Sequence, residues 1–419
     1  MRILKGTAAE AYVKKLERRG SRIEEVEPAV KKIVNDLRNN GDRALRNYAK
    51  RFDGLGTRES LRISESELRQ AWNSTARPLK SSLQMAAKNI RQFCEWQKPS
   101  EWMRSAKGIS LGQMVRPLES VGCYVPGGRF PLVSTLLMAV IPAQVAGVKY
   151  IRLVSPRPSS EVLAAAAMLG VNEFYKVGGA QAIAALAYGT KTIPRVDKIV
   201  GPGSLYVTAA KKMVSFDCAI DMLAGPTEVV IVSSRGKASF IAADLVAQAE
   251  HDPETLAVFI TTSEELADAV ITSLKRGKPG GPPLHIPAIA KESLKHRGAA
   301  LIATSKQQAF DWANRMAPEH ITVDRPDLSL VRNAGSIFVG DYSAQAAGDY
   351  ASGPNHVLPT AGVARFRGGL SVMDFVKLIT VQEVSSGGLS RLAPAIVQLA
   401  ETEGLRAHAE SIRVRCASA

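Results

Sequence analysis

The chain has 419 residues, of which 46% are hydrophobic and 22% are charged, with a formal net charge of +15. This composition excludes an intrinsically disordered chain, and the length exceeds that of one ordinary domain. No apolar run of about 18 residues occurs, which argues against a transmembrane helix. Residues 1–5 lack an apolar signal core, so we expect a cytoplasmic location.

The cysteines and the basic charge give little sign of function. Four cysteines stand alone, and no Cys-x-x-Cys pair occurs. A structural disulfide set or a thiolate zinc site is therefore not expected. The positive charge can attract nucleic acid, and a non-catalytic nucleic-acid-binding protein is one alternative. Lys and Arg are scattered among acidic neighbours, however, so we interpret the charge as a solvated basic surface.

The predicted elements change in character along the chain. Residues 8–52 are expected to form amphipathic helices, because apolar side chains recur there at helical spacing. From about residue 110, β-branched runs alternate with alanine-rich stretches, which indicates parallel sheets with crossover helices. Strands are predicted at 150–154, 173–177, 198–200, 228–232, 256–261, 300–303, 321–323 and 336–339. Helices are predicted at 161–169, 181–188 and 205–214, and again from about 373 to the C-terminus.

Glycine turns follow two of these strands, at 177–181 (VGGAQ) and 200–204 (VGPGS), and a third lies at 124–128 (YVPGG). Glycine lets the backbone approach a pyrophosphate, and a helix N-terminus presents free N–H groups. The first two turns do not match the G-x-G-x-x-G fingerprint. Each alone is therefore more typical of a plain strand–helix connection.

A candidate metal set begins at 244–253, which we predict to be a helix that ends near its proline. Gln248 and His251 are then i and i+3 on one face, and an amide oxygen and an imidazole nitrogen can hold zinc. The plain alternative is a surface glutamine beside a helix-end histidine. Three more polar clusters, at 317–320, 348–356 and 403–408, argue against that alternative. Together the four clusters contain four of the six histidines.

Taken together, these stretches resemble the histidinol dehydrogenase family. The resemblance extends from about residue 20 to the end of the chain, and its last block is highly specific. The blocks are 121–128 (VGCYVPGG), 177–185 (VGGAQAIAA), 196–208 (VDKIVGPGSLYVT), 220–229 (IDMLAGPTEV), 244–253 (DLVAQAEHDP), 317–320 (APEH) and 348–360 (GDYASGPNHVLPT).

The expected fold is α/β, with two incomplete Rossmann-like parallel-sheet domains. Residues 23–120 and 230–372 are expected to form the first domain, with the zinc and catalytic residues. Residues 121–229 form the second domain, with the NAD-binding turns. Residues 1–22 are expected to be an N-terminal helical arm. Residues 373–419 are expected to be a C-terminal helical tail that completes the site of the partner subunit in a homodimer.

The resemblance also implies roles for single residues. Glu319 and His320 are the implied acid–base pair, and zinc is implied at Gln248, His251, Asp349 and His408. Substrate contacts are implied for Thr227, Gln248, His251, His320, Asp349, His356, Glu403 and His408, and NAD contacts for Tyr124, Gln181 and Ser204. The implied reaction oxidises L-histidinol through L-histidinaldehyde to L-histidine with reduction of two NAD, the last steps of histidine biosynthesis.

Two departures from the family pattern and two rival hypotheses bear on these expectations. Ser204 stands where the family has an asparagine, which bears on cofactor affinity. Thr227 stands where it has a serine, which bears on the shape of the substrate pocket. A same-fold enzyme for another polar alcohol, such as a sulfonated diol, would not need Glu403 or this zinc set. A thiohemiacetal at Cys123 or Cys218 is disfavoured, because both lie in apolar surroundings.

Overall fold

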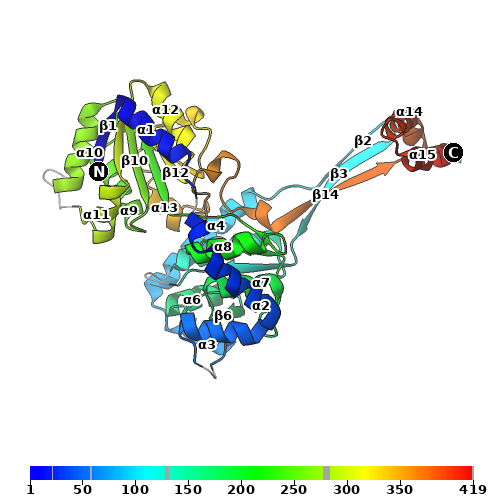
Figure 1. Ribbon diagram of the computed structural model, residues 1–419, viewed down its shortest axis with the longest axis horizontal. Coiled ribbons are helices and arrows are strands. Elements are labelled where there is room, and N and C mark those ends of the chain that lie inside the picture. Colours follow the sequence, from blue (N-terminus) through cyan, green and yellow to red (C-terminus); the bar gives the residue numbers. More distant parts are fainter. Residues whose placement is uncertain (21, 57–58, 128–131, 277–283, 418–419) are drawn as a thin grey trace.

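The computed structural model describes residues 1–20, 22–56, 59–127, 132–276 and 284–417. Two α/β units lie beside each other, and a long arm extends away from them (Figure 1). Each unit is built on one parallel sheet, as the sequence predicted. In the described ranges, no helix is long and apolar enough to cross a membrane.

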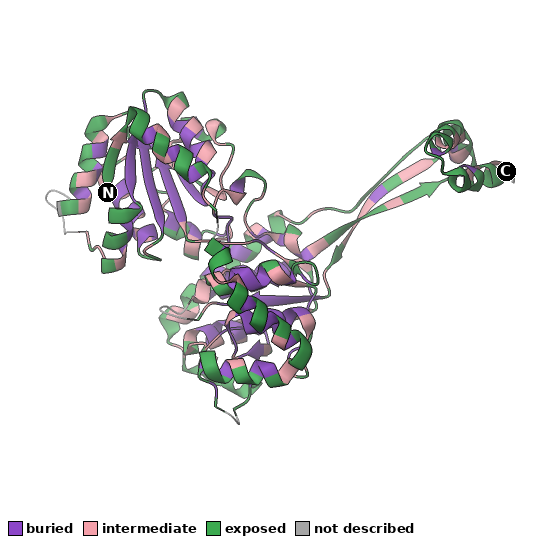
Figure 2. Cartoon of the chain, viewed as in Figure 1, coloured by how far each residue is buried: buried purple, intermediate pink, exposed green. Residues whose placement is uncertain are grey.

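The first unit contains a six-stranded parallel sheet in the order β1-β11-β10-β9-β12-β13. Its strands are β1 (Arg2–Lys5), β9 (Glu228–Val232), β10 (Leu256–Thr261), β11 (Ala299–Ile302), β12 (His320–Val323) and β13 (Ser336–Val339). Its helices are α1 (Gly6–Glu17), α9 (Ala238–Ala249), α10 (Glu264–Arg276), α11 (Ala288–His296), α12 (Lys306–Met316) and α13 (Gln345–Tyr350). Helices α1 and α12 contribute to the core on one face, and α9, α10 and α11 to the core on the other. Every residue of β9 and β10 is therefore buried (Figure 2).

The second unit contains a five-stranded parallel sheet in the order β6-β5-β4-β7-β8. Its strands are β4 (Ser120–Tyr124), β5 (Tyr150–Val154), β6 (Glu173–Tyr175), β7 (Lys198–Val200) and β8 (Ala219–Ile220). Its helices are α2 (Glu27–Tyr48), α3 (Glu65–Ser74), α4 (Arg77–Trp96), α5 (Val133–Ala146), α6 (Ser160–Met168), α7 (Gly179–Tyr188) and α8 (Leu205–Val214). Helices α3 to α6 share one core, and α2, α7 and α8 share the other.

This packing corrects the expected domain boundaries at the N-terminal end. Helices α2, α3 and α4 lie within the range 23–120 that we expected in the first domain, yet their apolar faces are buried in the cores of the second sheet. Residues 1–22 are not a free arm, because β1 pairs with β11 and α1 buries Ala9, Val13 and Leu16 against the first sheet. Contacts between distant segments determine which sheet these helices cover and how residues 1–22 are attached. The periodicity of apolar residues along the chain does not predict such contacts.

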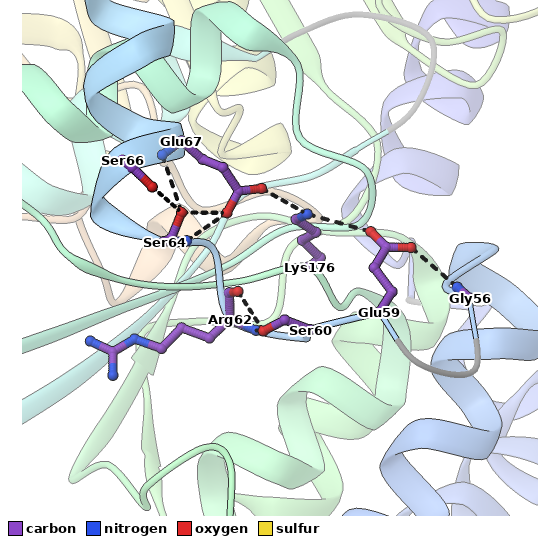
Figure 3. Close-up of polar contacts among 8 residues, drawn as sticks. All are labelled: Gly56, Glu59, Ser60, Arg62, Ser64, Ser66, Glu67 and Lys176. Atoms are coloured by element: carbon purple, nitrogen blue, oxygen red, sulfur yellow. Dashed lines mark hydrogen bonds and ion pairs between the residues drawn. The ribbon is translucent and has the colours of Figure 1, made fainter.

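Residues 59–67 close the edge of the second sheet beside β6 (Figure 3). Ile63 N–H donates to the Phe174 carbonyl at 2.8 Å, and Lys176 N–H donates to the Leu61 carbonyl at 2.7 Å. The Lys176 ammonium lies 3.4 Å from Glu59 and 3.1 Å from Glu67, whose side chain also completes the capping box of α3. An edge covered in this way is protected from pairing with another chain.

The arm is a three-stranded antiparallel sheet that the sequence analysis missed. Its strands are β2 (Trp102–Ala106), β3 (Ile109–Pro117) and β14 (Val376–Val384), and α14 (Ser386–Thr402) and α15 (Arg406–Ala417) lie at its far end (Figure 1). The prediction of helix from residue 373 onward is therefore wrong for 376–384. These nine residues pair with β3, more than 250 positions earlier in the chain, and only this non-local partner makes them a strand.

Candidate active site

Glu319 and His320 lie where β12 begins, next to Glu228 at the start of β9. Helix α12 ends at Met316, and the next residue, Ala317, has φ of 44°, an unusual value for a residue with a side chain, so the chain turns sharply into Pro318. The backbone N–H of Glu228 donates to the Glu319 carboxylate at 2.9 Å. The Glu228 carbonyl oxygen lies 3.3 Å from His320 Nδ1. Both predicted catalytic side chains are thus held by the backbone of one residue.

The hydrogen bond at His320 Nδ1 defines the tautomer. A carbonyl oxygen only accepts, so Nδ1 carries the hydrogen and Nε2 is the basic nitrogen of the neutral ring. Nε2 lies 3.5 Å from Asp349 Oδ1 and is one of the few buried polar atoms without a hydrogen bond in the described residues. Burial acts to lower the pKa of His320, but the Glu319 and Asp349 carboxylates outweigh burial and raise it. Burial raises the pKa of Glu319 to about 8.

A polar cluster from three elements faces His320. Gln248 on α9 donates from Nε2 to Asp349 on α13 at 2.8 Å. His356 lies with Nδ1 2.7 Å from the Asp349 carbonyl oxygen and Nε2 3.3 Å from Thr135 Oγ1. Burial lowers the pKa of His356 and outweighs Asp349, which acts to raise it. A neutral His356 therefore lies beside an ionised Asp349.

His251 lies near His356 but outside helix α9. Helix α9 ends at Ala249, before the proline near which we expected it to end, and His251 follows in a bend with an exposed side chain. Pro253 disfavours the helical conformation at Asp252, so the helix cannot continue to the proline. Gln248 and His251 therefore do not share a helix face.

His408 and Glu403 are not brought to the site within one chain. His408 is exposed on α15 and Glu403 is exposed at the end of α14, both at the far end of the arm (Figure 1). Among the residues that the structure describes, no three His, Cys, Asp or Glu side chains form a group that could hold a metal ion. The structure thus brings only some of the predicted zinc ligands together. Gln248 contacts Asp349, His251 lies near His356, and His408 lies at the far end of the arm.

The predicted cofactor residues lie around the glycine turns of the second sheet. Tyr124 ends β4, and its hydroxyl accepts a hydrogen bond from Gly179 N–H at 3.1 Å. Gln181 is buried and donates to Asp53 at 3.1 Å, and Asp53 also accepts from Gly178 N–H at 3.2 Å. Sequence reasoning missed Asp53, because Asp53-Gly54 reads as an ordinary turn signal. Gly128, at the end of the third turn, lies outside the described residues.

The second turn, before α8, is shaped by a buried ion pair. Gly201 has φ of +112°, and a Cβ there would lie 2.2 Å from the Tyr124 carbonyl oxygen, so only glycine fits. Asp221 accepts from Gly201 N–H at 2.7 Å. Lys211 donates to the Gly201 carbonyl at 3.0 Å and pairs with Asp221. Ser204 follows as the exposed N-cap of α8, and its side chain makes no capping hydrogen bond.

Lys211→Met is expected to lower the free energy of unfolding by about 3–5 kcal/mol, because it leaves the buried Asp221 carboxylate unpaired. The matched control is Lys212→Met next to it. Lys212 pairs with Glu27 at the surface, where a pair contributes about 1 kcal/mol or less. Urea denaturation of the three proteins measures both values. Equal losses in the two variants would contradict a special role for the buried pair.

The two candidate cysteines do not favour a thiohemiacetal. Cys123 is fully buried within β4, and Cys218 is buried among α7 and α8. Burial raises the pKa of the Cys218 thiol to about 12, and burial also raises the pKa of Cys123. The Cys123 thiol contacts the Ala139 carbonyl, and the Cys218 thiol contacts the Val196 and Ala219 carbonyls. The acid–base pair therefore remains the better chemical candidate.

The acid–base pair lies at the amino end of β12, an inner strand of the first sheet. The glycine turns of the second sheet follow the carboxyl ends of its strands, which is typical of a dinucleotide-binding α/β dehydrogenase. The model of the family "Histidinol dehydrogenase" matches residues 16–416. Histidinol dehydrogenase from Methanothermobacter thermautotrophicus is 45% identical over 416 residues, covering 96% of each chain. The Bacillus anthracis histidinol dehydrogenase is 45% identical over 414 residues, again covering 96% of each. This chain belongs to the histidinol dehydrogenase family.

The fold agrees with this assignment. The crystal structure of histidinol dehydrogenase from Elizabethkingia anophelis superimposes with a TM-score of 0.93 at 35% sequence identity, covering 100% of this chain and 98% of that one. The expected family and α/β fold are therefore confirmed. The comparisons give no support to a sulfonated diol as the substrate, and membership of an enzyme family argues against a non-catalytic protein.

Proposed function

We propose that the chain oxidises L-histidinol through L-histidinaldehyde to L-histidine and reduces two NAD, as the last steps of histidine biosynthesis. The observation that carries this proposal is the state of His320. Its Nδ1 is anchored on a backbone carbonyl, and its buried Nε2 has no hydrogen bond among the described residues. A base held in this way is ready to accept a proton from a bound alcohol.

The chemistry divides between the two adjacent side chains. His320 Nε2 accepts the hydroxyl proton as the alcohol carbon is oxidised to the aldehyde. Glu319, which lies 3.7 Å from His320 Nδ1, then accepts a proton from the water that adds to the aldehyde. His320 releases its first proton to solvent between the two oxidations, then takes the remaining hydroxyl proton of the hydrate, and the product is the carboxylate. NAD supplies the hydride acceptor in each step.

The zinc site that we propose comprises Gln248, His251, Asp349 and His408. An amide oxygen, a carboxylate and two imidazoles form a donor set that zinc accepts. The direct contact of Gln248 with Asp349 supports the proposal, since turning the amide over would direct its oxygen to a shared cation. Zinc, when bound, would orient the imidazole and amino nitrogens of histidinol.

The remaining proposed substrate contacts are Thr227, His356 and Glu403. Thr227 precedes β9, next to the residue that holds the catalytic pair, and His356 lies against Asp349. Glu403 carries the carboxylate that would pair with the substrate amino group. Since Glu403 and His408 are on the arm, we infer that they serve the site of a second copy of the chain.

The arm itself supports a homodimer. Five large apolar side chains on its strands are between 43% and 53% exposed, namely Trp102, Met103, Leu111, Leu378 and Ile379. A long apolar strand surface in water marks a protein–protein interface, and exchange of the arms between two copies would cover it. The dimer would then also complete the zinc set.

The NAD contacts that we propose are Tyr124, Gln181 and Ser204. Tyr124 and Gln181 are already fixed around the Gly178-Gly179 turn, whereas the Ser204 hydroxyl is free to hydrogen-bond a ligand directly or through water. A cytoplasmic location remains a prediction from the sequence.

The test is NADH formation from L-histidinol by the purified protein. We expect two NADH per histidinol consumed, loss of activity after treatment with a chelator, and recovery with zinc. Absence of turnover in a protein that binds zinc and NAD would contradict histidinol as the substrate. Activity that survives removal of the metal would contradict the zinc proposal alone.

A further inference from the structure

A nearly buried ion pair lies behind the catalytic residues. Arg19, just after α1, donates from Nε and Nη2 to the two carboxylate oxygens of Glu228, both at 2.6 Å. The side chains are 16% and 6% exposed. The third nitrogen of Arg19 donates to the Leu16 carbonyl at 2.7 Å, at the end of α1. Such a two-point pair fixes the orientation of both partners.

Glu228 connects this pair to the active site. Its carboxylate also accepts from Ala361 N–H at 3.0 Å, which joins the loop after His356 to the start of β9. Its backbone N–H and carbonyl are the groups that contact Glu319 and His320. The side chain of Glu228 therefore holds the segment whose backbone orients both catalytic side chains.

We propose that Arg19 and Glu228 are positioning residues that set the geometry of Glu319 and His320. This inference rests on the proposed function of that pair. The Arg19 charge also compensates the Glu228 carboxylate, which otherwise would place a second negative charge beside Glu319. The segment just after α1 thus contributes to catalysis through the backbone of Glu228.

Arg19→Met tests this inference in the full-length enzyme. We expect kcat for L-histidinol to fall by about 10–100-fold, with KM changed less than about threefold, because small misplacements of catalytic groups reduce the rate more than binding. Arg315→Met is the matched control. Arg315 also fastens α1 to the first unit, through Glu10 and Glu17, but does not contact Glu228.

A second variant, Arg19→Lys, keeps the charge and loses the two-point contact. Its kcat is expected between those of the wild type and Arg19→Met, and it provides the decisive measurement if the methionine variant does not fold. Thermal unfolding of each variant separates lost stability from lost rate.

The inference is overturned if Arg19→Met and Arg19→Lys keep the wild-type kcat, or if Arg315→Met loses as much kcat as Arg19→Met. Failure of the wild type to oxidise L-histidinol would instead contradict the proposed function. The two failures are therefore distinguishable.

Discussion

His320→Asn is expected to lower kcat for L-histidinol by about 10²–10⁴-fold, the usual contribution of a general base. Asparagine is similar in size and can still donate to the Glu228 carbonyl, but it has no basic nitrogen at the position of Nε2. Steady-state NADH formation measures the effect. The matched control is His296→Asn at the exposed end of α11, which should retain wild-type activity.

Glu319→Gln should give a different pattern from His320→Asn. The amide can still accept from Glu228 N–H, but it cannot take a proton from water. The first oxidation should therefore continue while the second is slow, so that one NADH forms rapidly per active site and the aldehyde accumulates. Identical progress curves for the two variants would contradict separate roles for Glu319 and His320.

His408→Asn and His320→Asn are each expected to be inactive, yet mixed dimers of the two should recover activity. In a mixed dimer with exchanged arms, one site combines an intact His320 with an intact His408 from the other chain. Random pairing of equal amounts then gives about a quarter of the wild-type activity, since half of the dimers are mixed and each has one complete site. The measurement is NADH formation after the two variants are unfolded and refolded together.

The control for this experiment is a mixture of His320→Asn with Glu319→Gln. Both changes lie in the same site of one chain, so a mixed dimer contains no complete site, and full two-step activity should not return. Absence of recovery in the His408→Asn and His320→Asn mixture would indicate that each chain uses its own His408. The exposed position of α15 in one chain makes that outcome unexpected.

Much of the parallel architecture could be predicted from the sequence. The predicted strands 150–154, 198–200, 228–232, 256–261 and 336–339 coincide with β5, β7, β9, β10 and β13. Such strands are short, rich in β-branched residues and bounded by turn residues, so the pattern is local. Strand β1 was missed, because four residues at the N-terminus become a strand only through pairing with residues 299–302.

The candidate site was predictable to a similar degree. Family motifs named Glu319, His320, Gln248 and Asp349, and the structure brings these side chains together. No motif pointed to Arg19 or Asp53, and Glu228 lies in the block 220–229 but was given no role there. Each acts through a partner more than 100 residues away, and a single arginine or carboxylate has no local pattern that distinguishes it from a surface charge.

The sequence by itself determined the family and the alternation of strands and helices, and it predicted the residues that carry the chemistry, because these depend on local pattern and motif. Only the tertiary structure decided which sheet the N-terminal helices cover, that residues 376–384 form an arm with β3, and that His408 lies far from Asp349. Those features depend on contacts between distant segments. The free energy that stabilises those contacts comes from burying surfaces that meet only when the chain has folded.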